Sequence, residues 1–247
     1  MKQFMLSGDA SADRQRRFSG KDYHYLVDVR RMKPGDSLHA LDECGNHFHL
    51  TVEDVNAGEL VASIQKRAAP STKGPRIRLY QCLPKGRKFD QIIRQATEAG
   101  VHELVPVHSE HTIRDVAGKW NRLTQRYEAV IREAVQQSGN VHAPALLEPV
   151  RSDEIEPHGS DGVGIFFHQY PLADSHLHGY LNSDPTQVSL VVGPEGGLSD
   201  RETALLTEKG FHPAYLGPFV LRTETAAIYA IAAVQTILLE RASWTLK

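Results

Sequence analysis

The segment VSLVVGPEGGLSDRETALLTEKGFHPAYLGPFVLRTETA, residues 188–226, contains two units in which a predicted strand leads into a loop. Residues 188–192 are apolar and mostly β-branched, which is typical of a buried strand. The loop GPEGG at 193–197 follows, and its glycines permit backbone conformations that a Cβ atom disfavours. Residues 214–217 predict a second strand, and residues 219–225 predict a second loop.

A helix is predicted after each of the two loops. Ser199 is followed three residues later by Glu202, the spacing of a capping box, and Lys209 with Gly210 indicates the end of that helix. An apolar run from residue 226 predicts a second helix that closes the chain. Glycine-bearing loops at the ends of neighbouring strands indicate a crevice for a small molecule. Two ordinary strand-to-helix turns in an α/β domain explain the same pattern, and the spacing alone does not decide between them.

The alternation of strand and helix begins further upstream. The predicted strands are 76–83, 103–107 and 164–168, and the predicted helices are 88–99 and 119–137. Strands that alternate with helices indicate a mostly parallel sheet with helices on both faces. We therefore predict an α/β domain over residues 75–247.

The N-terminal part has a different pattern. Three segments of partial alternation are separated by turn residues: 37–41, 46–52 and 59–64. A helical turn is predicted at 22–27 and a hairpin hinge at 42–45. Strands at this spacing suggest a small β-barrel. The turn-forming sequence APSTKGP at 69–75 follows, so we predict a separate β-barrel domain over residues 1–70.

The composition is that of an ordinary globular protein, because 40% of the residues are hydrophobic and 23% are charged. The N-terminus lacks the apolar core of a secretory signal, and the apolar run at 226–234 is too short to span a bilayer. Cys44 and Cys82 make neither a disulfide framework nor a zinc site. The histidines between 168 and 178 lack well-spaced carboxylate or cysteine partners, so no metal is predicted. A cytoplasmic location with no membrane partner is the default expectation.

The formal net charge of −2 hides a segregated distribution of charge. Basic residues gather in the N-terminal part and again between 73 and 94, whereas acidic residues dominate elsewhere, as at 153–156. Such segregation can create a basic face that contacts the phosphates of a nucleic acid. Ordinary solvated surface charge is the alternative for each residue. The candidates for phosphate contacts are Arg16, Arg17, Arg31, Lys85 and Lys88.

Three common motifs are absent from the sequence. The loop GPEGG does not match the dinucleotide fingerprint GxGxxG, and neither a GxxxxGK[ST] phosphate loop nor a GxSxG elbow occurs. A loop of glycine and proline offers mainly backbone N–H and C=O groups. Such groups can read the edge of an adenine and hold a thioether cofactor without a charged clamp. This permits a purine-bearing cofactor but does not select one.

Residues 190–199 (LVVGPEGGLS) and 216–226 (LGPFVLRTETA) strongly resemble the SPOUT superfamily of knotted methyltransferases. Within it, the chain is most similar to the bacterial family that methylates N3 of a uridine in 16S ribosomal RNA. The likeness runs over most of the chain. The other matching segments are 16–18 and 24–36, which resemble the family's PUA-like RNA-binding domain, together with 88–101, 109–110 and 136–139.

The resemblance implies a fold, a cofactor and partners. It implies a PUA-like β-barrel followed by a knotted, mostly parallel α/β sheet, whose C-terminus passes through a preceding loop as a trefoil knot. It also implies a homodimer that acts on 16S rRNA or the small ribosomal subunit, with S-adenosylmethionine as the methyl donor. The residues that it assigns to the cofactor are Leu190, Val192, Gly193, Glu195, Gly196, Gly197, Leu216, Gly217, Val220, Leu221, Thr223 and Thr225.

The same resemblance places residues 222–225 beside the methyl group and the RNA base. Methyl transfer to N3 of uracil requires loss of the N3 proton, and negative charge then develops on the flanking carbonyl oxygens. Arg222 is the catalytic candidate for stabilising this charge, because a guanidinium is permanently charged and offers several donors. The alternative for Arg222 is a salt bridge to Glu195 or Glu224. No general base is identifiable.

Three positions depart from the family pattern. Asn140 and Phe219 stand where arginine is frequent. His111 stands at the arginine position of a common Ser-Glu-Arg pattern, since this chain has Ser109-Glu110-His111. Each replacement removes a cation that could contact phosphate, which bears on RNA affinity and on the choice of nucleotide. Thr223 and Thr225 either contact the cofactor or cap the last helix. Two other functions stay open, namely ribose 2′-O-methylation by the same fold and a non-catalytic assembly factor that binds rRNA.

Overall fold

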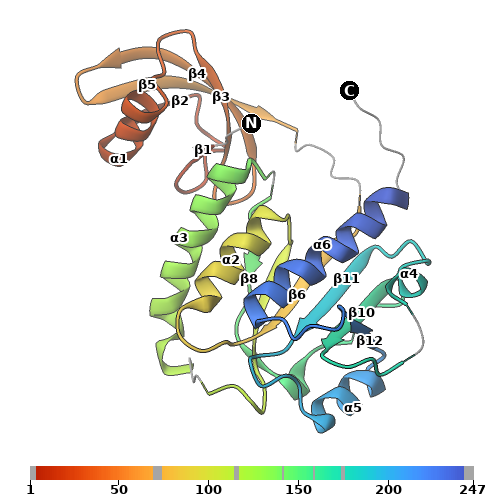
Figure 1. The fold of residues 1–247 in the computed structure, drawn as a ribbon. Helices are drawn as coiled ribbons and strands as arrows, with labels where there is room; N and C mark the ends of the chain where they lie inside the picture. The colour runs from red at the N-terminus through yellow and green to blue at the C-terminus, as the bar shows by residue number, and fades with distance from the viewer. Residues whose placement is uncertain are drawn as a thin grey trace. The chain divides into compact units, whose positions relative to one another are not determined.

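The computed structural model of the chain divides into two compact units. The first comprises residues 1–71 and 135–142, and the second comprises residues 72–134 and 143–247. Figure 1 shows the ribbon of the chain, with labels on many of its helices and strands. The residues that the structure describes are 4–68, 74–113, 117–140, 142–157, 159–173 and 176–241. Most of the predicted linker at 69–75 lies outside these ranges.

The first unit is built on a five-stranded mixed sheet. Its strands are β1 (Phe4–Met5), β2 (Gln15–Ser19), β3 (Ser37–Leu41), β4 (His47–Asn56) and β5 (Glu59–Arg67). The order is β1-β3-β4-β5-β2, in which β1 and β3 are parallel and the other pairs are antiparallel. The three predicted strands are confirmed, although β4 and β5 run further than their sequence pattern indicates. The sequence did not reveal β1 and β2.

A helical segment packs against this sheet. Helix α1 (Gly20–Tyr23) continues into η1 (His24–Val29), in which hydrogen bonds run to the fifth residue back. Leu26 of this segment is buried in the same core as Phe18 and Phe48 of the sheet. The sheet and the helical segment therefore share one hydrophobic core, as expected of a small domain.

The second unit contains a seven-stranded sheet in which every pair of strands is parallel. Its strands are β6 (Arg76–Cys82), β7 (Glu103–His108), β8 (Ala145–Leu146), β9 (Val150–Arg151), β10 (Gly162–His168), β11 (Gln187–Val192) and β12 (His212–Tyr215). The order is β12-β10-β11-β6-β7-β8, and β9 also pairs with β7. The predicted parallel sheet is confirmed, and β10 lies between β11 and β12.

Helices cover both faces of this sheet. The helical elements are α2 (Lys88–Glu98), η2 (Ala117–Lys119), α3 (Trp120–Ser138), η3 (Ser152–Glu154), α4 (Leu177–Tyr180), α5 (Asp200–Glu208) and α6 (Thr223–Arg241). Helices α2 and α6 pack together, and α6 packs on β11 (Figure 1). Leu206 of α5 is buried against Tyr80 and Val191. Because successive strand residues point to opposite faces, burial on both sides explains the continuous apolar strand sequences.

Helix α5 begins and ends as predicted. The hydroxyl of Ser199 accepts a hydrogen bond from the N–H of Glu202 (3.1 Å), and the Glu202 carboxylate accepts one from the N–H of Ser199 (2.9 Å). These two bonds form the capping box that the sequence indicated. Lys209 follows as the C-cap, and the helix end carries the chain into β12.

The last helix begins earlier than its apolar sequence indicates. Thr223 is the first residue of α6, and the N–H of Ala226 donates to the carbonyl of Arg222. Residues 223–225 therefore form a helical turn, and the prediction of a loop there was wrong. Strand β12 also lies two residues before the predicted segment 214–217. The second loop therefore covers residues 216–222 instead of the predicted 219–225.

Candidate functional site

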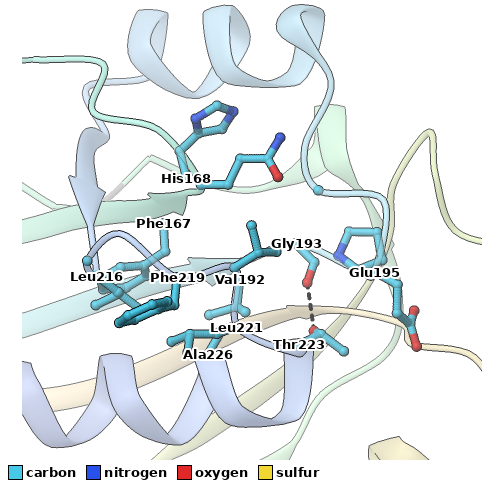
Figure 2. A pocket seen from close by; sticks show the side chains of 15 residues that line it. Phe167, His168, Val192, Gly193, Glu195, Leu216, Phe219, Leu221, Thr223 and Ala226 are labelled. Atoms are coloured by element: carbon cyan, nitrogen blue, oxygen red, sulfur yellow. Dashed lines mark hydrogen bonds between the residues drawn. The ribbon is translucent and has the colours of Figure 1, made fainter.

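The main candidate site is a pocket at the carboxyl ends of β10, β11 and β12. Figure 2 shows side chains of both glycine-bearing loops, the end of β10 and the start of α6 around it. Ligands commonly bind at this edge of an open parallel sheet. The lining consists of Phe167, His168, Gln169, Val192, Gly193, Pro194, Glu195, Gly197, Leu216, Gly217, Phe219, Val220, Leu221, Thr223 and Ala226.

The structure brings most of the predicted cofactor residues to this lining. Those present are Val192, Gly193, Glu195, Gly197, Leu216, Gly217, Val220, Leu221 and Thr223. The other three lie elsewhere. Leu190 is fully buried within β11, Gly196 packs against His111, and Thr225 is exposed on α6. The assignment of these residues to a cofactor stays a prediction.

The end of β10 forms a wall that sequence reasoning missed. Phe167, His168 and Gln169 line the pocket, although they lie outside the segment 188–226. They are brought there because β10 lies between β11 and β12 in the sheet. His168 and Glu195 are the ionisable side chains of the lining. No spacing in the sequence indicates this strand order.

Close packing explains the glycines of the first loop. A Cβ atom on Gly193 would lie 3.1 Å from the carbonyl carbon of Gly197 and 3.2 Å from the backbone nitrogen of Leu198. A Cβ atom on Gly196 would lie 3.0 Å from the Cβ of His111. Gly197 has a φ angle of +73°, which glycine adopts without strain. The loop therefore folds closely on itself and leaves backbone groups at the pocket.

A buried glutamine joins the two loops. Gln81 of β6 is 1% exposed, and its Nε2 group donates to the hydroxyl of Thr223 (3.0 Å), the carbonyl of Cys82 (2.9 Å) and the carbonyl of Val192 (3.4 Å). The Thr223 hydroxyl donates in turn to the carbonyl of Gly193 (2.7 Å), the bond drawn in Figure 2. Thr223 thus ties the start of α6 to the first loop. The sequence signal for this contact was the amide side chain of Gln81 within a predicted strand of mainly apolar residues.

Glu195 holds the first loop against the start of α2. Its carboxylate accepts hydrogen bonds from the Lys88 ammonium (2.8 Å) and from the backbone N–H of Lys85 (3.2 Å). Burial raises the pKa of the Glu195 carboxyl, but the hydrogen bond from Lys88 and the backbone bonds outweigh it, so the pKa lies below its ordinary value. The hydrogen bond to Glu195 also raises the pKa of Lys88. Both groups are therefore charged at neutral pH.

A second carboxylate fixes the neighbouring loop. Glu202 is 2% exposed, and it accepts a hydrogen bond from the N–H of Glu110 (2.9 Å) in addition to that of Ser199. His111 follows Glu110, and its Nδ1 atom lies 3.1 Å from the carbonyl oxygen of Gly197. The capped helix thus positions the loop after β7, which in turn contacts the glycine loop. His111 has a structural contact here, although it departs from the family pattern.

The Arg222 side chain is exposed and unpaired. Among the residues that the structure describes, it forms neither a hydrogen bond nor an ion pair. Glu195 is engaged by Lys88, and a Glu224 oxygen lies 3.4 Å from the same ammonium, at ion-pair distance but without hydrogen-bond geometry. The alternative salt bridges of Arg222 are therefore not observed. Its guanidinium is available to a ligand.

The predicted phosphate contacts divide into paired and unpaired cations. The pairs are Arg16 with Asp13 (3.0 Å), Arg17 with Glu59 (3.0 Å) and Lys88 with Glu195 (2.8 Å). Arg31 and Lys85 are exposed, and their side chains form no ion pair within the described ranges. Exposed pairs are weak, so phosphate can compete for Arg17, whereas Lys88 is held between two carboxylates.

The described part of the chain gives little support for a metal site, a reactive thiol or a membrane-spanning helix. It holds no group of three or more His, Cys, Asp or Glu side chains arranged to bind a metal ion. Cys82 is buried, and burial raises the pKa of its thiol to about 12, so it is protonated at neutral pH. None of the helices there combines the length and the apolar surface needed to cross a membrane.

Comparisons with known proteins identify the family. The RNA methyltransferase domain matches residues 72–235, and the RNA methyltransferase PUA domain matches residues 18–65. The chain belongs to this RNA methyltransferase family. Ribosomal RNA small subunit methyltransferase E from Synechocystis is 31% identical over 87% of this chain and 71% of that protein. The Aquifex aeolicus protein of the same name is 30% identical, over 83% of this chain and 87% of its own.

Solved structures of methyltransferases share the fold. The Neisseria gonorrhoeae ribosomal RNA small subunit methyltransferase E, bound to S-adenosyl methionine, has a TM-score of 0.78 at 25% identity, covering 96% of this chain and 98% of that one. A methyltransferase structure from Legionella pneumophila with the bound cofactor SAM has a TM-score of 0.77 at 26% identity, covering 95% and 96%. The predicted fold class, a PUA-like domain before a SPOUT-type parallel sheet, is confirmed.

Proposed function

We propose that the protein transfers a methyl group from S-adenosylmethionine to N3 of a uridine in 16S ribosomal RNA. One observation carries the proposal: both glycine-bearing loops line a single pocket, next to an exposed and unpaired guanidinium. Family membership supports an RNA substrate, and the two ligand-bound relatives support the cofactor. The uridine N3 position rests on the resemblance of residues 190–199 and 216–226 to the family that makes this modification.

The pocket suits this cofactor chemically. Val192, Leu216 and Leu221 offer apolar surface to an adenine ring, while the backbones of both loops offer N–H and C=O groups to its edge. A side chain at Gly193 would collide with the backbone of Gly197 and Leu198 at the other end of the same loop. The glycine therefore allows the loop to keep this conformation at the pocket. When bound, S-adenosylmethionine supplies a methyl group activated by a positively charged sulfur.

We expect Gln81→Leu to weaken S-adenosylmethionine binding by about fivefold, because one lost buried hydrogen bond is worth roughly 1 kcal/mol. Leucine has a similar size but leaves the Thr223 hydroxyl and the carbonyl of Cys82 without their donor. Isothermal titration with the cofactor measures the change. Gln187→Leu is the matched control, since Gln187 begins the neighbouring strand β11 at its opposite end. Equal affinity of Gln81→Leu and the wild type would contradict the role of this network.

Arg222 acts on the methyl acceptor in this proposal. N3 of uracil becomes nucleophilic when it loses its proton. The resulting negative charge spreads to the carbonyl oxygens on either side of N3. A guanidinium can donate two hydrogen bonds to such oxygens and remains charged throughout. The exposed position of Arg222 at the start of α6 suits this contact.

RNA docking is assigned to the first domain and to cations beside the pocket. We propose a PUA-like domain over residues 1–70 and a methyltransferase domain over residues 75–247, whose C-terminus is threaded as a trefoil knot. Arg31 and Lys85 are the exposed, unpaired cations among the predicted contacts. Phosphate contacts of this kind give affinity without sequence information. An rRNA substrate would place the protein in the cytoplasm.

We also propose a homodimer formed through α6. One face of this helix is buried in its own unit, but the opposite face is exposed and carries no charge between residues 225 and 239. The exposed residues follow helical spacing: Thr225, Tyr229, Ala232, Thr236 and Leu239. Tyr229 is 52% exposed and Leu239 is 41% exposed. A helix that is apolar all round is usually buried, so a second copy is the expected cover.

A charged substitution at the centre of the exposed face of α6 tests the proposed dimer. We expect Tyr229→Arg to convert a dimer into a monomer in size-exclusion chromatography with light scattering, because a buried unpaired charge opposes association. Ile113→Arg is the control, since Ile113 is 74% exposed and lies outside α6. A wild-type monomer, or a Tyr229→Arg dimer of unchanged stability, would rule out this interface.

Two measurements test the proposed function and separate its alternatives. Isothermal titration should show S-adenosylmethionine binding; no binding at millimolar cofactor would favour the non-catalytic assembly factor. Mass mapping of rRNA from a deletion strain, before and after treatment with the purified protein, locates the modification. A methyl group restored on the base of one 16S uridine is the expected result. A methyl group on a ribose 2′-oxygen, or on another nucleotide, would reject the proposal.

A further inference from the structure

The mouth of the pocket carries an unusually exposed aromatic ring. Phe219 is 81% exposed, although it belongs to the pocket lining, and Figure 2 shows it among Leu216, Leu221 and Ala226. Exposing a phenyl ring gives up the favourable burial that most aromatic side chains obtain. A ring in this position can make apolar contact with a ligand that enters the pocket.

The loop presents this ring on a constrained backbone. Gly217 has a φ angle of +122°, and the ring of Pro218 fixes the next φ angle. The other end of the loop enters α6, where Thr223 is bonded to Gly193 at 2.7 Å. A short segment held at both ends restricts where the Phe219 ring can lie, which lowers the entropy lost when a ligand contacts it.

We propose that Phe219 stacks on the RNA base presented for methylation, and so positions the uracil beside the cofactor pocket. This inference rests on the proposed function. Single-stranded and extruded bases are recognised largely by stacking on aromatic side chains, because every base has a flat apolar face. Arg222 lies three residues further along the chain with its guanidinium unpaired. A ring for the face of the base and a donor for its carbonyl edge together fit a pyrimidine.

The location of the ring favours a base over a second protein copy. Phe219 belongs to the lining of the pocket that the methyl acceptor must reach, whereas the exposed residues of the uncharged face of α6 are not part of that lining. Stacking also explains how the loop works without the arginine that the family frequently carries at this position: affinity comes from the base instead of from phosphate.

The test compares Phe219→Ala, Phe219→Leu and Phe219→Trp on unmethylated 16S rRNA from a deletion strain. We expect kcat/KM for rRNA to fall about 5- to 150-fold in Phe219→Ala, because base stacking on an aromatic is worth roughly 1–3 kcal/mol. Phe219→Leu keeps an apolar side chain but no ring and should lose nearly as much. Phe219→Trp should stay active, and its added fluorescence should be quenched by rRNA in the presence of S-adenosylhomocysteine, beyond any quenching of the two native tryptophans.

Measurements of cofactor affinity and of oligomeric state distinguish stacking from other roles of the ring. The affinity for S-adenosylmethionine should be unchanged in all three variants; a parallel loss would make the ring a cofactor contact and overturn the proposal. A change in oligomeric state would make it an interface residue and overturn it equally. Full activity of Phe219→Leu would exclude stacking. Ile113→Ala changes a side chain that is 74% exposed on another loop, and this variant should behave as the wild type. Failure of the wild type to methylate rRNA would reject the proposed function itself. An active wild type together with an equally active Phe219→Ala would reject the stacking proposal alone.

Discussion

Arg222→Ala is expected to lower the rate of methyl transfer to 16S rRNA by about 100- to 1,000-fold, the effect typical of removing one donor that stabilises a developing anion. The affinity for S-adenosylmethionine should change little, because Arg222 is not part of the pocket lining. The defect should also shrink as the pH rises, since alkaline conditions ionise N3 of uracil without help from the enzyme. Single-turnover kinetics over a range of pH, together with cofactor titration, measure all three effects.

Two variants control the Arg222 experiment. Arg222→Lys keeps the positive charge but loses the planar fork of donors, so an intermediate rate is expected. Arg122→Ala removes an exposed cation from α3 and should leave the rate unchanged. A normal rate for Arg222→Ala would remove this residue from the reaction. A loss of cofactor affinity as large as the loss of rate would instead make it a binding residue.

Glu202→Ala is expected to destabilise the second unit by about 2–4 kcal/mol, because the change leaves buried donors without their acceptor. The carboxylate accepts from the backbone N–H groups of Ser199 and Glu110 and is itself 2% exposed. Its loss frees the loop that carries His111, so cofactor affinity should fall as well. Urea unfolding can be followed through the fluorescence of Trp120, which is buried in this unit.

The matched control lies on the same helix. Glu208 is exposed at the last turn of α5, and Glu208→Ala should change the free energy of unfolding by less than about 0.5 kcal/mol. Glu202→Gln keeps one acceptor oxygen and should fall between the wild type and Glu202→Ala. If Glu202→Ala unfolds at the wild-type urea concentration, the carboxylate does not brace the two loops.

Local signals in the sequence predicted the elements well. The capping box of Ser199 and Glu202 fixed the start of α5, and the apolar run before Gly193 predicted β11. These predictions succeed because a cap and a buried strand depend on residues close together in the chain. The start of α6 was misplaced because Thr223 is a polar residue held by Gln81 of β6 and by Gly193 in the loop after β11, both far away in sequence.

The sequence by itself determined the α/β class, the glycine loops and the family resemblance. The tertiary structure alone decided that β10 lies between β11 and β12, and that Gln81 and Glu195 bind the two loops to the rest of the unit. The physical reason is that strand pairing and side-chain hydrogen bonds join residues far apart in the chain: Gly162 pairs with Gln187, and Gln81 bonds Thr223 across 142 positions. No periodicity or spacing in the sequence reports on such contacts. The two loops of the segment 188–226 become walls of one pocket for this reason.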